Sequence, residues 1–214
     1  MRLHNILLRR KAYVAAKKEI ISVFVSHCCE EETGDLEVQL LKADTFAEYK
    51  ALIDKYCGNV TIHESYIESR FCNKDVFYCL VYCNDIVSTG WISTAPIFWI
   101  AEVDLFVQRK DENAAYVLYD FETKSQYRGK GYYPLLLRRM MLDFGNDNPY
   151  LIYAKKNNVA SIRGIQKAGF QFIGDVSYDQ QTGSQKLEPL GFSVVGRHYK
   201  FFGLYHSKKK SGLI

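Results

Sequence analysis

Two periods of hydrophobic and polar alternation divide the chain. Where every second residue is apolar, the pattern predicts a strand that turns one face toward a core. Where apolar residues recur every three or four positions between capping residues, it predicts a helix. The predicted strands are 36–41, 76–82, 86–93, 102–108, 114–123 and 150–155, and the predicted helices are 45–57, 64–71, 132–144 and 158–169. Polar turns between neighbouring strands predict two hairpins, 76–82 with 86–93 and 102–108 with 114–123.

Both ends of the chain are basic. Six lysines and arginines precede the first acid, Glu19, so residues 1–33 are predicted to be a basic, partly helical N-terminal extension. A helix at a membrane surface has such a pattern, but a solvated face on a packed helix is the commoner case. Residues 207–214 are predicted to be a basic tail, and residues 34–206 the domain between the two.

The composition indicates a soluble, folded domain. Of the 214 residues, 48% are hydrophobic and 24% are charged, which is close to the average of globular proteins. No apolar run approaches the roughly 18 residues that a membrane span needs, and the run Ile6-Leu7-Leu8 is too short for the core of a signal peptide. We therefore expect a cytoplasmic protein without stable membrane insertion.

Charge and cysteine usage exclude two further classes. The net charge is +4, and three of these charges are the lysines of the tail, so the domain itself is near neutral. Nucleic-acid binding is therefore not expected, because it needs a clustered basic face. None of the six cysteines forms the C-x-x-C pair that zinc sites commonly use, so we expect reduced thiols and no metal.

A glycine-rich loop lies between the strand 114–123 and the helix 132–144. It delivers Gly129 and Gly131 to a helix N-terminus, where unpaired N–H groups attract anions, and Arg128 and Lys130 add positive charge. The spacing fits neither a Walker loop, which would need Ser or Thr at Gly131, nor the dinucleotide pattern, which would need Gly at position 134. The loop is therefore predicted to bind a phosphate group of another kind.

The run Gln126 to Gly131, Gln-x-x-Gly-x-Gly, resembles the signature of the GNAT superfamily of acetyl-coenzyme A dependent N-acyltransferases. A second landmark of that family is a helix that begins Asn-x-x-Ala/Ser and ends Lys-x-Gly-Phe before a strand. This chain matches it at Asn158, Ser161, Lys167, Gly169 and Phe170. The two landmarks together span about residues 114–175.

The resemblance implies a fold and a cosubstrate. The implied fold is α/β (α+β), a mixed and mostly antiparallel twisted sheet, flanked by helices, whose central strands 114–123 and 150–155 splay apart. Acetyl-CoA would lie in the gap, with its pantetheine against main-chain groups of Phe121 and Thr123 and with Asn158 near the pantetheine or the ribose. The residues implied at the diphosphate are Gln126, Tyr127, Arg128, Gly129, Lys130, Gly131 and Tyr132.

The implied reaction is direct attack of an amine of a small molecule or amino sugar on the thioester. It needs a base for the ammonium proton, and Asp120 and Glu122 alternate along one strand, so both should face the same side. Glu102 and Asp104, predicted on the preceding strand, are fallback candidates. The general acid is unassigned, because Ile165 stands where many family members have Tyr; Tyr153, Tyr178 or solvent could serve instead.

Other interpretations remain open on the sequence alone. The chain could be a domain that binds coenzyme A without turnover, or its acceptor could be a protein amine. A homodimer is also compatible with the sequence. The segment 177–189 reads as a polar loop of the kind that shapes the acceptor side in this family, and Trp91, Phe98 and Trp99 are either an aromatic wall there or, more commonly for such residues, part of the core.

Overall fold

The computed structural model describes residues 19–27, 38–57, 64–145 and 147–196. The predicted tail 207–214 and the parts of the predicted extension at 1–18 and 28–33 lie outside these residues. In chain order the elements are β1 (Ile20–Ser26), β2 (Gln39–Ala43), α2 (Phe46–Cys57), α3 (Glu64–Cys72), β3 (Val76–Tyr82), β4 (Asp85–Ser93), β5 (Ile97–Ile100), η1 (Ala101–Val103), β6 (Leu105–Arg109), β7 (Tyr116–Thr123), η2 (Ser125–Tyr127), α4 (Tyr132–Phe144), β8 (Tyr150–Lys155), α5 (Val159–Lys167), β9 (Gln171–Ser177), α6 (Gln180–Leu187), η3 (Glu188–Leu190) and β10 (Phe192–Gly196).

The main sheet has seven strands in the order β2-β3-β4-β7-β8-β1-β9, and a smaller sheet has the order β10-β6-β5. In the main sheet, β7 and β8 pair in parallel, whereas the other neighbours pair antiparallel. The parallel pairing runs only from Tyr116 opposite Tyr150 to Leu118 opposite Ile152. Beyond that point the two strands continue to Thr123 and Lys155 without pairing with each other, so the predicted fold class and the splayed central strands are confirmed.

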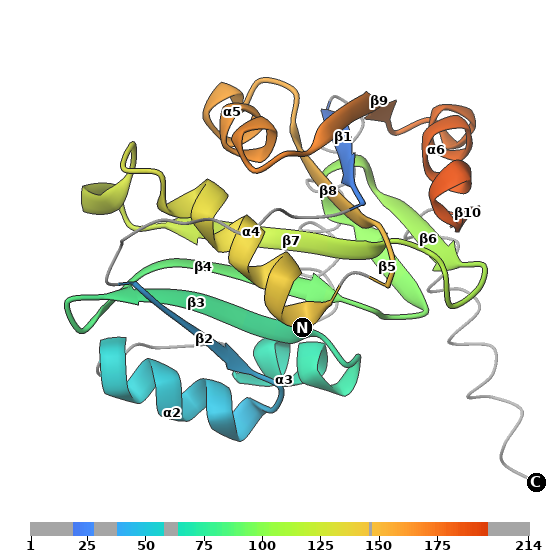
Figure 1. Ribbon diagram of the computed structural model, residues 1–214. Helices are drawn as coiled ribbons and strands as arrows, with labels where there is room; N and C mark the ends of the chain where they lie inside the picture. The colour runs from blue at the N-terminus through green and yellow to red at the C-terminus, as the bar shows by residue number, and fades with distance from the viewer. Residues whose placement is uncertain (1–18, 28–37, 58–63, 146, 197–214) are drawn as a thin grey trace, which may run out of the picture.

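Helices cover both faces of the main sheet. α4 lies across β3, β4 and β7 (Figure 1), and its residues Leu136, Leu137 and Met140 are fully buried against that face together with α5. On the other face, α2 and α3 pack over β3 and β4 through an aromatic cluster that includes Tyr49 and Trp91. The smaller sheet closes the same side under β1, β7 and β8. The gap between β7 and β8 therefore lies between α4 and α5 on one face of the sheet and α2, α3 and the smaller sheet on the other.

The first strand corrects the prediction for the N-terminal extension. Residues 20–26 were predicted to belong to a partly helical arm, but they form β1, which pairs with β8 on one side and β9 on the other. Ile21 and Val23 are completely buried. A strand covered on both faces reads as an unbroken apolar run instead of an alternating one, and for this reason the alternation pattern misses it. The predicted boundary at residue 33 is thus wrong for this stretch.

Two further predictions are wrong in their details. The predicted hairpin of 102–108 with 114–123 does not form, because β6 pairs with β5 and β10, while both edges of β7 are taken by β4 and β8. The predicted loop 177–189 contains the helix α6, which begins where Asp179 accepts a hydrogen bond from the main-chain nitrogen of Gln181 at 3.2 Å. With few apolar residues, α6 carries almost no hydrophobic signal in the sequence.

Candidate functional site

A cleft of about 580 Å³ opens where β7 and β8 separate, and most of the predicted coenzyme A residues line it. It is bounded by the end of β7, the glycine loop, the first turn of α4 and one face of α5. The residues predicted from the sequence that line it are Phe121, Glu122, Thr123, Tyr127, Arg128, Gly129, Gly131, Tyr132 and Asn158. Gln126 and Lys130 belong to the same loop but do not line the cleft. Segments more than 30 residues apart in the sequence thus meet here.

The glycine loop presents main-chain N–H groups to the cleft. Gly129 and Gly131 have φ angles of 76° and 84°, in the region that glycine adopts without strain. Gly131 is the N-cap of α4, and no side chain caps this helix end. A Cβ atom at either glycine would meet nothing within 4 Å, so the space above the loop is open. An uncapped helix N-terminus facing open space is a favourable place for an anion.

One face of α5 forms the opposite wall, and three of its residues, Ala160, Arg163 and Gly164, were not singled out from the sequence. Asn158 caps the helix by accepting a hydrogen bond from the main-chain nitrogen of Ser161 at 3.2 Å. Gly164 allows a close approach, because a Cβ there would lie 2.4 Å from the ring of Tyr133. Arg163 and Lys167 add two cations to the wall. The small residues Ala160 and Gly164, one turn apart, are the signal that could have identified this face.

A bulge in β7 places Asp120 on the same side of the sheet as Tyr119 and turns Phe121 toward the cleft. The pairing with β4 jumps from Tyr119 opposite Trp91 to Glu122 opposite Thr89, and Asp120 has a φ angle of +53°. Gly90 therefore faces two residues of β7, as in a β-bulge. A Cβ at Gly90 would lie 2.1 Å from the ring of Phe121, so only glycine leaves room for that ring, which faces the cleft.

A second pocket of about 280 Å³ lies on the other side of β4 and β7, under α2 and α3. Asp120 and Glu122 both line it, as their alternation predicts. Among the residues that the structure describes, Glu122 alone lines this pocket and the cleft as well. The Glu122 carboxylate is exposed and has no hydrogen-bond or ion-pair partner among those residues. It is therefore free to interact with a ligand in either space.

Asp120, in contrast, is held by an ion pair. Nη2 of Arg70 lies 2.6 Å from Oδ2 of Asp120 and also donates to the Tyr66 hydroxyl at 2.7 Å. The Arg70 side chain is 8% exposed, and its guanidinium lies over the rings of Tyr66, Trp91 and Tyr119 at 4.6, 4.7 and 5.1 Å. Nothing in the sequence linked this arginine to Asp120, because 50 positions separate them.

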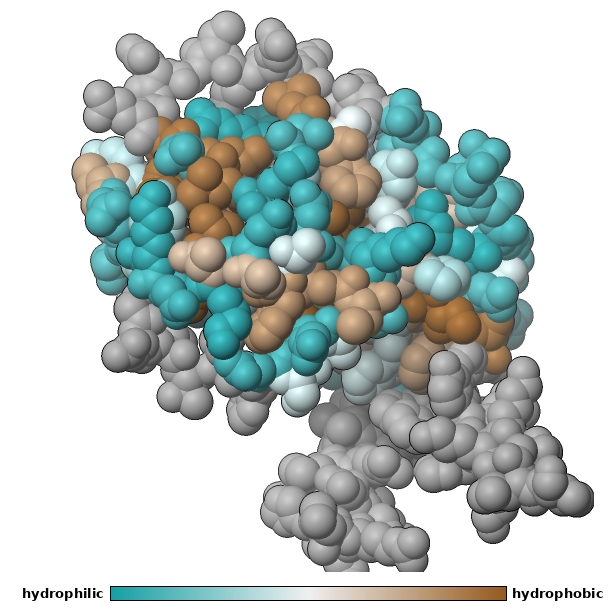
Figure 2. Space-filling view, turned by 90° about the horizontal axis from the view of Figure 1, so that it is seen from below, coloured by the Kyte–Doolittle hydropathy of each residue, from teal (hydrophilic) through white to brown (hydrophobic). Residues whose placement is uncertain are grey.

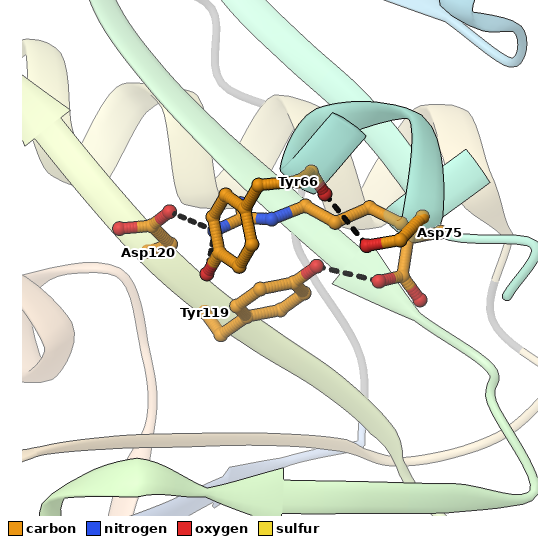
Figure 3. A network of polar contacts seen from close by, with 6 residues as sticks. Tyr66, Asp75, Tyr119 and Asp120 are labelled. Carbon is orange, nitrogen blue, oxygen red and sulfur yellow. Dashed lines mark hydrogen bonds and ion pairs between the residues drawn. The ribbon is translucent and has the colours of Figure 1, made fainter. Parts of the chain in front are cut away.

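A second carboxylate, Asp75, is buried and belongs to the same network. Asp75 accepts hydrogen bonds from the hydroxyls of Ser93 and Tyr119, each at 2.5 Å. Figure 3 shows Asp75 and Asp120 on opposite sides of the rings of Tyr66 and Tyr119. Burial raises the pKa of Asp75, although the two hydrogen bonds and Arg70 oppose the shift. The network holds Arg70, and through it Asp120, in a fixed position.

The fallback carboxylates do not lie on a strand as predicted. Glu102 is in η1 and Asp104 follows it with a φ angle of 49°. Asp104 is buried and accepts a hydrogen bond from Nε1 of Trp99 at 3.2 Å, which marks it as structural. Burial raises the pKa of Glu102, whose Oε2 atom has no partner among the described residues.

The aromatic candidates fall into different environments. Trp91 is buried and lines the second pocket, Phe98 is part of the core and Trp99 is 39% exposed, so the three do not form one wall. Tyr153 lies in the core, where burial raises the pKa of its phenol well above the usual value, and Tyr178 is also buried. Neither of these phenols lines the cleft.

No helix among the described residues is long and apolar enough to cross a membrane. Within the same part of the chain, no group of three or more His, Cys, Asp or Glu residues is arranged to hold a metal ion.

No protein-family model and no curated protein matches the chain in sequence. Solved structures of GNAT-family acetyltransferases are similar to it in fold. One from Colwellia psychrerythraea is 13% identical over 74% of this chain and 54% of its own length, with a TM-score of 0.44. One from Novosphingobium aromaticivorans, described as putative, is 13% identical over 73% and 61%, with a TM-score of 0.47.

A third similar structure is an aminoglycoside acetyltransferase from an uncultured soil metagenomic sample, in complex with sisomicin. It is 10% identical over 61% of this chain and 86% of its own, with a TM-score of 0.42. The chain spans little more than half the length of the first two structures. Because the identities and scores are low, the function of this chain has to be inferred from its own residues.

Proposed function

We propose that this protein is an N-acetyltransferase that moves the acetyl group of acetyl-CoA to the amine of a small molecule. The observation that carries the proposal is the position of Glu122, an acidic residue that lines both the cleft and the second pocket. A base at such a junction can reach an amine in one space and a thioester in the other. Proton transfer by a positioned carboxylate is a common part of such chemistry.

The cleft suits the chemistry of coenzyme A. Its volume of about 580 Å³ is within the range of roughly 300–1,000 Å³ that is typical of ligand pockets. The diphosphate would lie on the N–H groups of the loop Gly129–Gly131, with Arg128, Arg163 and Lys167 near the phosphates. The amides of pantetheine would pair with the edge of β7 beyond Leu118, which β8 leaves unpaired.

The reaction follows from these placements. With the amine in the second pocket, Glu122 takes its ammonium proton. The free amine attacks the thioester carbonyl, a C–N bond forms and the C–S bond breaks. The sulfur leaves as a thiolate, the nitrogen loses its second proton to solvent as the amide forms, and the thiolate takes a proton from solvent. Unpaired N–H groups of β7 are available for the developing oxyanion. Asp120 is less suited as the base, because Arg70 already neutralises it.

Replacing the base tests the proposal. Glu122→Gln removes the proton acceptor and keeps the shape, so kcat should fall by about 100-fold or more, while calorimetric titration should give an unchanged Kd for coenzyme A. Asp120→Asn is the matched control on the same strand and should lower kcat less. If Glu122→Gln retains full kcat on an amine that the wild-type protein acetylates, Glu122 is not the base.

One observation favours a second candidate, a domain that binds coenzyme A without turnover. The residue at the position expected for a general acid is Ile165, which is completely buried. Under this alternative the wild-type protein binds coenzyme A but acetylates neither small amines nor a protein amine. A protein acceptor and a homodimer remain predictions from the sequence, and mass spectrometry of acetylated products and sedimentation would test them.

A further inference from the structure

The second pocket has an apolar and aromatic floor. Helices α2 and α3 contribute Ile53 and Ile67, and Phe77 and Trp91 come from the strands beneath them. Phe77 and Trp91 pack edge to face at 5.1 Å, so the floor is continuous. In Figure 2, a view from below onto the side where α2 and α3 lie in Figure 1, hydrophobic side chains reach the surface between hydrophilic ones. A ligand in the pocket would thus contact mostly carbon.

Of the charged side chains that line the pocket in the part of the chain that the structure describes, only one lacks a partner. Lys124 forms an ion pair with Asp85, and Asp120 forms one with Arg70. Glu122 has no ion-pair partner among the described residues, so it leaves one net negative charge at the end of the pocket nearest the cleft. Arg70 already covers the ring faces of Tyr66, Trp91 and Tyr119, so a ligand cation would be attracted to the carboxylate instead of to an aromatic cage.

The volume sets the size of the ligand. The pocket measures about 280 Å³, which at roughly 30 Å³ per molecule is the volume of about nine water molecules. An amine with a single ring and a short chain has this size, whereas a lysine side chain, with five non-hydrogen atoms, would leave much of the floor uncovered. Tyr49, Ser88 and Thr89 also line the pocket and carry hydroxyls. An amino sugar has several hydroxyls, and those that face Ile53, Ile67 and Phe77 would lack hydrogen-bond partners, at a cost of about 1–3 kcal/mol for each buried group.

From this floor, charge and size we infer that the acceptor is a small primary amine with an apolar, single-ring body, held with its ammonium group toward Glu122. The inference rests on the proposed acetyl transfer and names its substrate class. It replaces the amino sugar that the sequence left open with an arylalkylamine.

The test compares three acceptors with the full-length protein and acetyl-CoA: 2-phenylethylamine, glucosamine and a peptide with one lysine and a blocked N-terminus. Release of the coenzyme A thiol and the mass of the product are measured. We expect kcat/KM for 2-phenylethylamine to exceed both others by about tenfold or more, because buried hydroxyls of glucosamine would lack partners on the apolar floor and the lysine side chain would leave much of that floor uncovered. Preference for glucosamine or the peptide would overturn the inference, as would the absence of any product.

Substitutions in the second pocket provide a second test of the acceptor class. Ile67→Asn places an amide on the floor and should raise KM for 2-phenylethylamine about tenfold, with little change in kcat. Ile53→Asn is a second such variant on α2. Leu142→Asn makes the same change at an exposed position of α4 that lines neither pocket, and it should leave KM unchanged. An unchanged KM in both folded pocket variants would overturn the inference.

Calorimetric titration with coenzyme A, read together with the acceptor results, distinguishes a wrong acceptor class from a wrong proposal of acetyl transfer. If coenzyme A binds and glucosamine or the peptide is acetylated in preference to 2-phenylethylamine, only the acceptor class is wrong. If coenzyme A binds and no product forms, the result is the one expected of a domain that binds without turnover, and the proposed acetyl transfer is wrong as well. If the wild-type protein does not bind coenzyme A, the proposed acetyl transfer itself is wrong and the acceptor class falls with it.

Discussion

At the scale of single residues, the role of each carboxylate depends on its neighbours in space. Asp120 and Glu122 are two positions apart and line the same pocket, yet Arg70 neutralises the first and leaves the second free. Their alternation in the sequence predicted a shared side but could not separate their roles. The separation comes from Arg70, a residue 50 positions from Asp120. Such long-range partners are invisible to patterns of local spacing.

The glycine loop is the residue-scale feature that the sequence predicted best. Gly131→Asp should weaken coenzyme A binding, because the new carboxylate would lie against the phosphates at the N-terminus of α4. Gly131→Asn is the matched control, since it has the same size and the same unfavourable positive φ angle without the charge. Calorimetric titration should give a clearly weaker Kd for the aspartate than for the asparagine variant. Equal Kd values would exclude a charge effect at this loop.

The hydrogen bonds to Asp75 should make stability depend on pH. Tyr119→Phe removes one donor, which raises the already elevated pKa of the Asp75 carboxyl further. The free energy of unfolding of the variant should be about 1–3 kcal/mol lower than that of the wild-type protein at pH 7. The raised pKa means that the folded state is destabilised by the ionised form of Asp75 and not by the protonated form. The difference in unfolding free energy between the variant and the wild-type protein should therefore shrink as the pH falls toward the ordinary aspartate value near 4.

The measurement for this variant is urea unfolding at several pH values. Tyr116→Phe is the control on the same strand, because the Tyr116 hydroxyl has no hydrogen-bond partner among the described residues. A deficit for Tyr119→Phe that is the same at pH 4 and pH 7 would mean that the phenol does not stabilise the ionised form of Asp75.

At the scale of elements, helices with one apolar face were predicted almost to the residue. α4 was predicted at 132–144 and is found there, because its apolar stripe ends at Gly145, which takes a positive φ angle. β1 and α6 were missed for opposite physical reasons. β1 is apolar on both faces, so it does not alternate, whereas α6 has almost no apolar face. Local patterns find elements that are half buried.

The N-cap of α5 links helix stability to the cleft. Asn158→Ala removes the cap and should lower the unfolding free energy by about 0.5–2 kcal/mol, and it should also weaken coenzyme A binding because Asn158 lines the cleft. Asp179→Ala removes the corresponding cap of α6, which lies outside the cleft, and should cost similar stability at an unchanged Kd. Thermal unfolding and calorimetric titration of both variants make the comparison. A loss of affinity in both would mean that the effect is one of stability alone.

At the scale of the whole molecule, the sequence predicted the class of the sheet and the splay but not the full strand order. The splay of β7 from β8 was expected from the resemblance, whereas the insertion of β1 between β8 and β9 pairs residues 124 to 157 positions apart. The partner of β6 was also predicted wrongly, since adjacent strands were assumed to pair. Pairing over such distances is decided by the packing of the finished core and leaves no local pattern.

The central position of β1 makes a clear prediction. Val23 is completely buried, so Val23→Asp would place an unpaired carboxylate in the core, at a cost of several kcal/mol. Against a typical total stability of about 5–15 kcal/mol, this variant should lose cooperative thermal unfolding. Ile20→Asp, in the same strand but 40% exposed, should unfold within a few degrees of the wild-type protein. Normal unfolding of Val23→Asp would show that β1 is not part of the folding unit.

The central claim is that main-chain amides at the start of α4 hold a diphosphate in the gap between β7 and β8. A crystal structure of the protein with coenzyme A tests it most directly. The account predicts diphosphate density over Gly129 and Gly131, with pantetheine along the free edge of β7 and its sulfur near Glu122. Coenzyme A bound elsewhere, with side chains filling the space above the two glycines, would contradict it.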